Sequence, residues 1–144
     1  MQKVIDILLK KGAHIESVTP ETPVLEALRT MAQKNYGSIA VMEDGVFKGI
    51  MTERDYSRKV VLLGKSSSDT PVSEIMSTDL PSVSPNDSID HCMALMNSRN
   101  VRYIPVYDGD NLCGLISMTD VVRATISGHE ATISHLESYI SRSY

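Results

Sequence analysis

The chain has 144 residues, of which 42% are hydrophobic and 22% are charged, and its formal net charge is -4 at pH 7. This composition excludes a disordered or fibrous chain, and the length suits one compact domain or two small units that pack together. The negative charge gives no general attraction to nucleic acid or to an anionic membrane, and no apolar run approaches the roughly 20 residues of a membrane span.

The first third of the chain predicts a helix, a short strand and a second helix. Residues 1–12 alternate apolar and charged side chains, which indicates a short amphipathic helix and not a signal peptide. A β-type fragment follows at residues 17–18, and the apolar residues of 24–31 then recur at the spacing of one helix face.

The next segment predicts a β-hairpin followed by a helix. Apolar runs at residues 38–42 and 46–51 flank an acidic-Gly turn, which is typical of two antiparallel strands. We expect a helix to begin at Thr52 and to end before a Ser-rich linker at residues 65–70.

The second half of the chain repeats the first. Residues 17–55 align without a gap onto residues 82–120, at a constant offset of 65, and residues 72–76 resemble the lead-in helix at residues 4–8. Each copy predicts strand, helix, strand, strand, helix, which is too small to bury its own sheet alone. We therefore expect the two copies to pack on each other about a pseudo-two-fold axis.

Each copy contains a Gly-apolar-apolar-Thr/Ser-x-x-Asp turn where a strand gives way to a helix, with Thr52 and Asp55 in the first and Ser117 and Asp120 in the second. Unpaired backbone N–H groups at a helix start favour anions, and a hydroxyl with a carboxylate can hydrogen-bond a ribose or a phosphate. The same pattern is also close to a capping box, in which both side chains only complete the helix start.

Two arginines distinguish these interpretations. Arg58 and Arg123 each follow the turn aspartate by three residues, and so lie one helical turn further along. A helix cap needs no arginine there, whereas an anion site would use one. A solvated surface charge remains the alternative for each residue alone.

The order of elements, the stretch Asn-Val-Arg-Tyr-Ile-Pro-Val at residues 100–106 and the two turns resemble a tandem CBS-domain pair, also called a Bateman module. The resemblance implies an α/β (α+β) fold of two repeats, each a small sheet with two helices. We expect a stand-alone pair with the first repeat and its lead-in helix at residues 1–65, the second repeat at 66–128 and a C-terminal helix or tail at 129–144.

The resemblance also implies two ligand sites, each built from both repeats. One would place Thr52 and Asp55 opposite Thr78 and residues 102–105, and the other would place Ser117 and Asp120 opposite residues 38–40. The complete predicted set of ligand-binding residues is Thr52, Arg54, Asp55, Arg58, Thr78, Arg102, Tyr103, Ile104, Pro105, Ser38, Ile39, Ala40, Ser117, Thr119, Asp120 and Arg123.

The strand residues of this set differ between the two predicted sites. Ile39 and Ile104 fit a position in the apolar core as well as they fit a ligand contact. Arg102 and Tyr103 stand where the first copy has Gly37 and Ser38, so we expect the Asp55 site to be the more charged and aromatic of the two.

The function implied is that of a regulatory sensor that binds an adenine nucleotide, with AMP as the first candidate and ATP or NAD as alternatives. It would act as a cytoplasmic homodimer that modulates a partner enzyme or transporter. The alternative is an interaction or dimerisation scaffold that binds no nucleotide and uses the apolar stripe of Ile133, Leu136 and Ile140 in the tail.

An enzyme and a metal site are both disfavoured. The chain has no Gly-x-Gly-x-x-Gly, no Walker lysine motif and no Gly-x-Ser-x-Gly elbow. Cys92 and Cys113 form no Cys-x-x-Cys pair, and we expect both to be free thiols in a reducing compartment.

Overall fold

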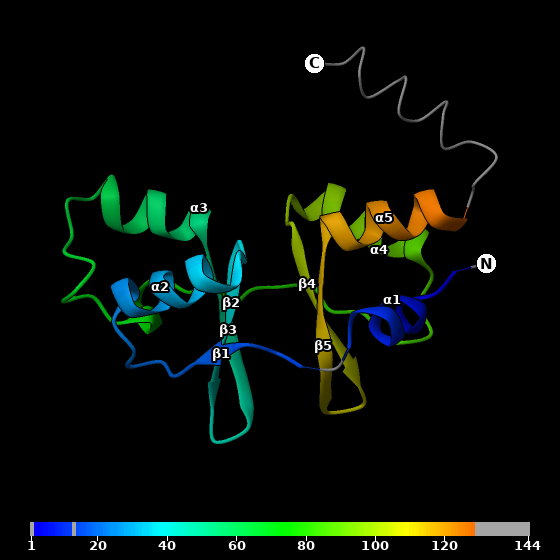
Figure 1. Ribbon diagram of the computed structural model, residues 1–144, viewed down its shortest axis with the longest axis horizontal. Helices are drawn as coiled ribbons and strands as arrows, with labels where there is room; N and C mark the ends of the chain where they lie inside the picture. The colour runs from blue at the N-terminus through cyan, green and yellow to red at the C-terminus, as the bar shows by residue number, and fades with distance from the viewer. Residues whose placement is uncertain (1, 13, 129–144) are drawn as a thin grey trace, which may run out of the picture. The chain divides into compact units, whose positions relative to one another are not determined.

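The structure, a computed structural model, describes residues 2–12 and 14–128. These residues form two compact units, which we call the repeat-1 unit (residues 15–80) and the repeat-2 unit (the described residues of 1–14 and 81–128). The elements in chain order are α1 (Val4–Lys11), β1 (Ser17–Val18), α2 (Val24–Lys34), β2 (Ser38–Glu43), β3 (Val46–Thr52), α3 (Glu53–Tyr56), the π-helix η1 (Ser57–Val61), the 3₁₀ turn η2 (Val72–Glu74), α4 (Ile89–Arg99), β4 (Tyr103–Asp108), β5 (Asn111–Ser117) and α5 (Met118–Gly128) (Figure 1).

Each unit is built on one antiparallel hairpin. In the repeat-1 unit β2 pairs with β3, and β1 adds a short parallel strand on the other side of β2. In the repeat-2 unit β4 pairs with β5, and a single parallel bridge between Val83 and Val106 replaces the third strand. Both hairpins shift register at the same repeat position, after Val41 and after Val106. The predicted duplicated α+β fold is confirmed, but the strand expected at residues 82–83 is reduced to the bridge between Val83 and Val106.

The long helix of each copy ends in the same way. Asn35 and Asn100, which are aligned in the sequence repeat, close α2 and α4 in the left-handed conformation with φ of 58° and 52°. Asparagine tolerates this conformation better than most residues, so it can end the helix where the chain turns toward the hairpin. The two copies therefore end this helix at the same repeat position and with the same residue type.

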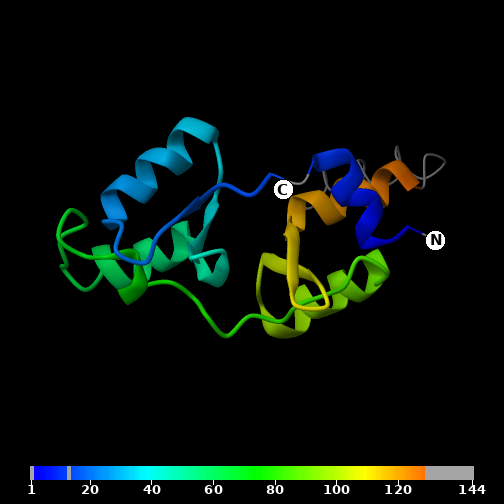
Figure 2. The ribbon, with the colours of Figure 1, turned by 90° about the horizontal axis from the view of Figure 1, so that it is seen from below.

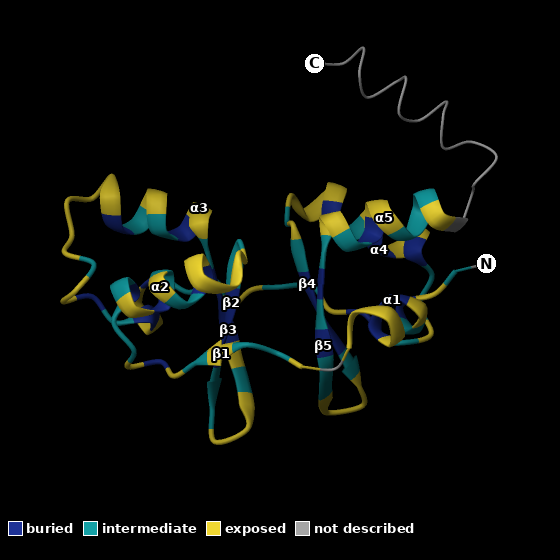
Figure 3. Ribbon diagram, viewed as in Figure 1, coloured by how far each residue is buried: buried dark blue, intermediate teal, exposed yellow. Residues whose placement is uncertain are grey.

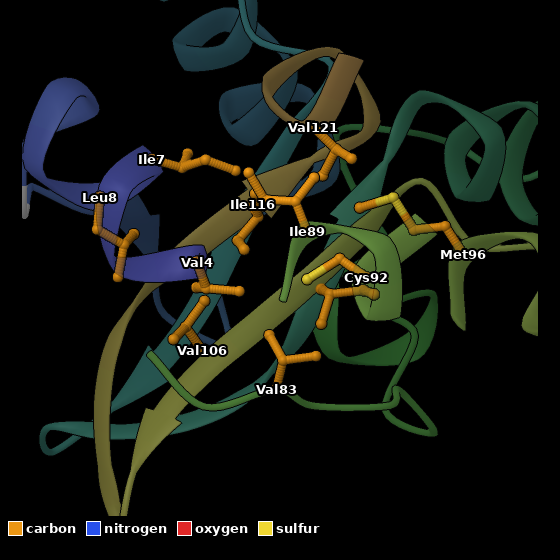
Figure 4. Packing of buried hydrophobic residues seen from close by; sticks show 11 residues of the cluster. Val4, Ile7, Leu8, Val83, Ile89, Cys92, Met96, Val106, Ile116 and Val121 are labelled. Carbon is orange, nitrogen blue, oxygen red and sulfur yellow. The ribbon is translucent and has the colours of Figure 1, made fainter. Parts of the chain in front are cut away.

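A separate apolar core lies in each unit, where the helices turn one face toward the sheet and expose the other (Figure 3). The repeat-1 core joins residues of α2, β2 and β3 with Val72 and Ile75. In the repeat-2 core, Val4 and Ile7 of α1 lie alongside Val106 and Ile116 of the sheet (Figure 4). Burial of such side chains contributes roughly 1.5–3 kcal/mol each.

The lead-in segments are exchanged between the two copies. Helix α1 packs beside α5 in the repeat-2 unit (Figure 2), where the backbone N–H of Val4 donates to the carbonyl of Asp87 at 2.9 Å. The segment that precedes the second repeat instead pairs with β3, through two hydrogen bonds of 3.0 and 2.8 Å between Ile50 and Ser77. The division at residues 65 and 66 therefore follows the sequence repeat, whereas the compact units cross it.

The second lead-in is not a full helix. Residues 72–76 resemble α1 in sequence, but they form only the one 3₁₀ turn η2. The first-copy helix also differs from its counterpart, because α3 continues as the π-helix η1 while α5 is a regular α-helix. Residues 129–144, where we expect a tail helix, lie outside the described residues. No helix in the described part of the chain is long and apolar enough to cross a membrane.

Candidate functional site

The Thr52–Asp55 turn forms a complete capping box at the start of α3. The hydroxyl of Thr52 accepts a hydrogen bond from the backbone N–H of Asp55 at 3.0 Å, and Oδ2 of Asp55 accepts one from the backbone N–H of Thr52 at 3.0 Å. The hydroxyl of Thr52 also lies 3.0 Å from the same Oδ2. The capping interpretation is therefore correct for this turn, and a ligand role would have to be additional to it.

The other oxygen of Asp55 is also engaged. Oδ1 accepts a hydrogen bond from the hydroxyl of Ser77 at 2.9 Å and lies 3.0 Å from Nζ of Lys59. Lys59 additionally donates to the carbonyl of Ile75 at 2.9 Å. Only 8% of the Asp55 side chain is exposed, so its charge is compensated inside the repeat-1 unit. A carboxylate has about four acceptor positions, and all of those of Asp55 are used.

The Ser117–Asp120 turn repeats the cap but not the rest of this network. Oδ2 of Asp120 accepts a hydrogen bond from the backbone N–H of Ser117 at 2.9 Å, and the Ser117 hydroxyl accepts one from the N–H of Asp120 at 3.1 Å. Within the described residues, Oδ1 of Asp120 takes part in no hydrogen bond, and the side chain is 16% exposed. Of the two turn carboxylates, Asp120 is the one with acceptor capacity left for a ligand.

Asp120 receives its counter-ion from α1. Nζ of Lys11 lies 2.7 Å from Oδ2 of Asp120 and donates to the carbonyl of Leu115 at 2.9 Å. Burial of Asp120 raises the pKa of its carboxyl, but the hydrogen bonds from Lys11 and Ser117 outweigh it and hold the pKa below the ordinary value. The carboxylate is therefore charged throughout the neutral range.

A groove opens beside this ion pair, between α1 and α5 of the repeat-2 unit. Its volume is about 560 Å³, which is within the range of small-ligand pockets. The charged residues that line it are Asp6, Lys10, Lys11, Asp120 and Arg123, and its apolar residues are Ile7, Leu9, Ala124 and Ile126. Three cations thus face two carboxylates across a largely apolar floor.

The remaining predicted site residues divide by exposure. The exposed residues are Arg54, Arg58, Thr78, Arg102, Thr119 and Arg123, the partly exposed ones are Ser38 and Tyr103, and the buried ones are Ile39, Ala40, Ile104 and Pro105. Ile39 is 1% exposed and Ile104 is not exposed at all, and each belongs to the core of its own unit. Their side chains fill the cores, which leaves only their backbone groups for a ligand.

Some residues of the first predicted site lie within one unit. Thr78 follows Ser77, whose hydroxyl donates to Asp55, so the linker segment does approach the Thr52–Asp55 turn. Residues 102–105 belong to the repeat-2 unit, and residues 38–40 belong to the repeat-1 unit. The pairing of each turn with strand residues of the other repeat therefore stays a prediction.

Sequence reasoning missed the two lysines and the serine that contact the turn carboxylates. Lys59 lies four residues after Asp55, in the π-helix that continues α3, and this spacing indicates an ion pair. At the same offset of 65 its counterpart is Ala124, so the sequence indicated that the two turn carboxylates have different neighbours. Lys11 and Ser77 carried no such signal, because their contacts depend on the exchange of the lead-in segments. In the described residues no group of three His, Cys, Asp or Glu side chains could hold a metal ion.

Two copies of one β/α unit, each with a capped strand-to-helix turn, define a tandem-repeat module. The CBS-domain family model matches residues 4–61 and 72–127, and the chain belongs to the CBS-domain family.

Curated relatives and solved structures agree with this assignment. The chain is 37% identical over 118 residues to the CBS domain-containing protein YhcV of Bacillus subtilis, covering 82% of the chain and 84% of the relative. It is 33% identical to the mitochondrial CBS domain-containing protein CBSX3 of Arabidopsis thaliana, covering 98% and 73%. A signal-transduction protein with CBS domains from Burkholderia ambifaria is 43% identical, with a TM-score of 0.84 over 88% of this chain and 95% of that one.

A more distant structure shares the fold and holds ligands. The CBS-domain pair of protein MJ0100 is 21% identical, with a TM-score of 0.77 over 89% of this chain and 98% of that one. It was solved in complex with 5′-methylthioadenosine and S-adenosyl-L-methionine.

Proposed function

We propose that this protein is a regulatory sensor that binds an adenosine nucleotide at its two strand-to-helix turns and passes the bound state to a partner. The observation that carries the proposal is the duplication of the turn with the same hydroxyl and carboxylate and an exposed arginine one helical turn later. A cap accounts for the first two groups but not for Arg58 and Arg123.

The chemistry of the turns suits an adenosine ligand. A carboxylate can accept hydrogen bonds from both hydroxyls of a ribose, and an exposed arginine can bind phosphate oxygens. Adenosyl compounds bound to the MJ0100 pair support this ligand class. AMP is our first candidate, with ATP and NAD as alternatives, because Arg58 and Arg123 give each turn a cation for a phosphate.

The free oxygen of Asp120 changes which of the two predicted sites we expect to bind ligand more readily. From the strand residues alone, the Asp55 site is expected to be the more charged one. Since Oδ1 of Asp55 is bonded to Ser77 and Lys59, a ribose there must displace a bond, whereas Oδ1 of Asp120 is available. We therefore expect the Asp120 site to fill first.

A thermal-shift panel of adenosine, AMP, ATP, NAD and S-adenosylmethionine tests the proposal on the wild type and on Asp55→Ala and Asp120→Ala. Both aspartates cap helices, so each variant melts lower without ligand, and the ligand-induced shift is the quantity to compare. Ser88→Ala is the matched control, because the Ser88 hydroxyl caps α4 at 3.1 Å outside the predicted sites. A panel with no shift on the wild type contradicts the proposal.

A scaffold that binds no nucleotide is the second candidate. The observation in its favour is the consecutive exposed apolar run at the end of η1 and directly after it, where Val61, Leu62 and Leu63 are 54%, 75% and 63% exposed. Contiguous exposed apolar residues are typical of interaction surfaces. In either case we propose a homodimer as the working assembly.

The cytoplasmic location is also a proposal. It rests on the two free cysteines, which suit a reducing compartment. The Arabidopsis relative carries the description mitochondrial, so fractionation of cells that express a tagged chain is the direct test.

A further inference from the structure

The groove between α1 and α5 reaches the point where the described chain ends. At one end of the groove, the Lys11–Asp120 ion pair joins the last turn of α1 to the first turn of α5. The groove then follows α5 as far as Ser127, and Gly128 is the last residue of this helix. The chain that continues from Gly128 therefore starts beside the groove and can enter it after one reversal.

The floor of the groove is apolar and its rim is basic. Leu9 on the α1 side is 76% exposed, the highest fraction among the large apolar side chains of the described residues. Ala124 and Ile126 line the groove from α5. The cations of the rim are Lys10, Lys11 and Arg123. They outnumber the two carboxylates that line the groove, so its best occupant is an apolar segment with an acidic edge.

The sequence that follows α5 has this pattern. Its apolar residues recur at the spacing of one helix face, at Ile133, Leu136 and Ile140. Glu130 precedes Ile133 by three residues and Glu137 follows it by four, so at helical spacing both carboxylates fall beside Ile133. The two glutamates are seven residues apart and therefore lie on the same edge of the apolar stripe.

We propose that residues 129–144 fold back as a helix whose apolar stripe covers the α1–α5 groove of the same chain, with its acidic edge toward the cations of the rim. The lengths of the two elements agree, because a helix from Ile133 to Ile140 spans roughly 10 Å and the eight residues of α1 span roughly 12 Å. Residues 129–132 then form a connection of about four residues, which is within the usual range between packed helices. This interface goes beyond the sensor function, because it needs no nucleotide.

The short connection favours the same chain over a second copy as the source of the helix. A segment tethered by a few residues is held near the groove at an effective concentration in the millimolar range, which is on the order of a thousandfold above that of a second copy at micromolar protein. The tail of the same chain therefore fills the groove first.

Disulfide crosslinking on the full chain tests this docking. Cys113→Ser removes the partly exposed thiol, while Cys92 is buried and can stay. In this background Leu9→Cys is combined either with Leu136→Cys, on the apolar stripe, or with Ser138→Cys, off the stripe, as the matched control. Under mild oxidation the Leu136→Cys pair should form an intramolecular disulfide about tenfold faster than the Ser138→Cys pair, because docking holds the two thiols together. The product is a cyclised monomer, which a denaturing gel without reductant separates from a covalent dimer.

Two charge variants test the acidic edge in the Leu136→Cys background. Glu137→Lys places a cation toward the basic rim and should slow the crosslink about threefold, whereas Arg142→Glu, on the opposite side of the predicted helix, should leave its rate unchanged. Circular dichroism shows that each variant is folded.

The other outcomes overturn the proposal. A disulfide-linked dimer in place of the cyclised monomer gives the groove to a second copy. Equal rates for Leu136→Cys and Ser138→Cys show that the stripe does not dock, and equal effects of Glu137→Lys and Arg142→Glu show that the acidic edge does not face the rim. None of these reactions needs a nucleotide, so their result is independent of the sensor function.

Discussion

A β-carbon added at Gly49 would lie 2.7 Å from the backbone oxygen of Ser77, closer than real side chains approach a backbone atom. The reason is that the residue after Gly49, Ile50, exchanges two backbone hydrogen bonds with Ser77. The glycine of the repeated turn motif is therefore needed in the first copy for the close approach of the lead-in segment. The same pairing brings the Ser77 hydroxyl to Asp55.

Gly49→Ala should destabilise the protein more than Gly114→Ala. At Gly114 the added β-carbon would meet Cδ2 of Leu8 at 2.7 Å, but this is the end of a flexible side chain that can rotate away. At Gly49 the backbone itself must move. We expect a loss of roughly 1–3 kcal/mol for Gly49→Ala and about 1 kcal/mol or less for Gly114→Ala, measured by urea unfolding. Equal losses of unfolding free energy in the two variants would show that the backbone at Ser77 moves away from the new methyl group at little cost.

Removing the Thr52 cap should weaken the start of α3. Thr52→Ala removes the acceptor for the Asp55 N–H and should cost about 1 kcal/mol of unfolding free energy. Thr52→Ser keeps the hydroxyl and is the matched control, as the second copy already has Ser117 at this position. If the serine variant is as unstable as the alanine variant, the threonine methyl group and not the hydroxyl is responsible.

The pKa of Asp120 predicts an acid-dependent contribution to stability. Burial raises the pKa of Asp120, but Lys11 and Ser117 lower it by more than burial raises it. The pKa in the folded protein therefore lies below that of the unfolded chain, about 3.9. The charged carboxylate therefore stabilises the fold above the unfolded pKa, and this stabilisation is lost as the pH falls through the folded pKa. Lys11→Met should reduce the difference in unfolding free energy between pH 6 and pH 3, with Lys10→Met as the control. An unchanged difference would mean that Lys11 does not set the Asp120 pKa.

The two cysteines should differ sharply in reactivity. Burial, with a smaller effect of the Asp87 charge, raises the pKa of the Cys92 thiol to about 11, and its side chain is not exposed. Cys113 is partly exposed on β5. A thiol reagent at pH 7.5 should modify one cysteine in the native protein and the second only in denaturant. Cys113→Ser should remove the fast reaction, and a fast reaction that persists in this variant would show that the Cys92 region opens readily.

The repeat could be predicted from the sequence because its signals are local. Hairpin turns, helix periodicity and the aligned Asn35 and Asn100 each depend on a few neighbouring residues, and they agreed in both copies. The caps at the two aspartates were also visible in the Thr/Ser-x-x-Asp pattern. The contacts of Lys11 and Ser77 could not be predicted from the sequence, because they join segments that are far apart in the chain. The exchange of the lead-in segments brings these segments together. The similarity of 72–76 to α1 even favoured a helix that does not form.

The apolar run at Val61, Leu62 and Leu63 predicts where the proposed homodimer forms. Val61 is the last residue of η1, Leu62 and Leu63 follow it, and all three are exposed. Ile126, the counterpart of Val61 in α5, instead lines the groove beside α1 and is partly covered. Replacing Leu62 and Leu63 by glutamate together should convert the dimer to a monomer in light scattering, because two charges cannot be buried at an apolar contact. Leu9→Glu, at an equally exposed leucine on α1, is the control that should keep the dimer. Deleting residues 129–144 tests the alternative that the tail forms the dimer interface. If the deletion variant is a monomer and the double glutamate variant is still a dimer, the interface lies in the tail instead.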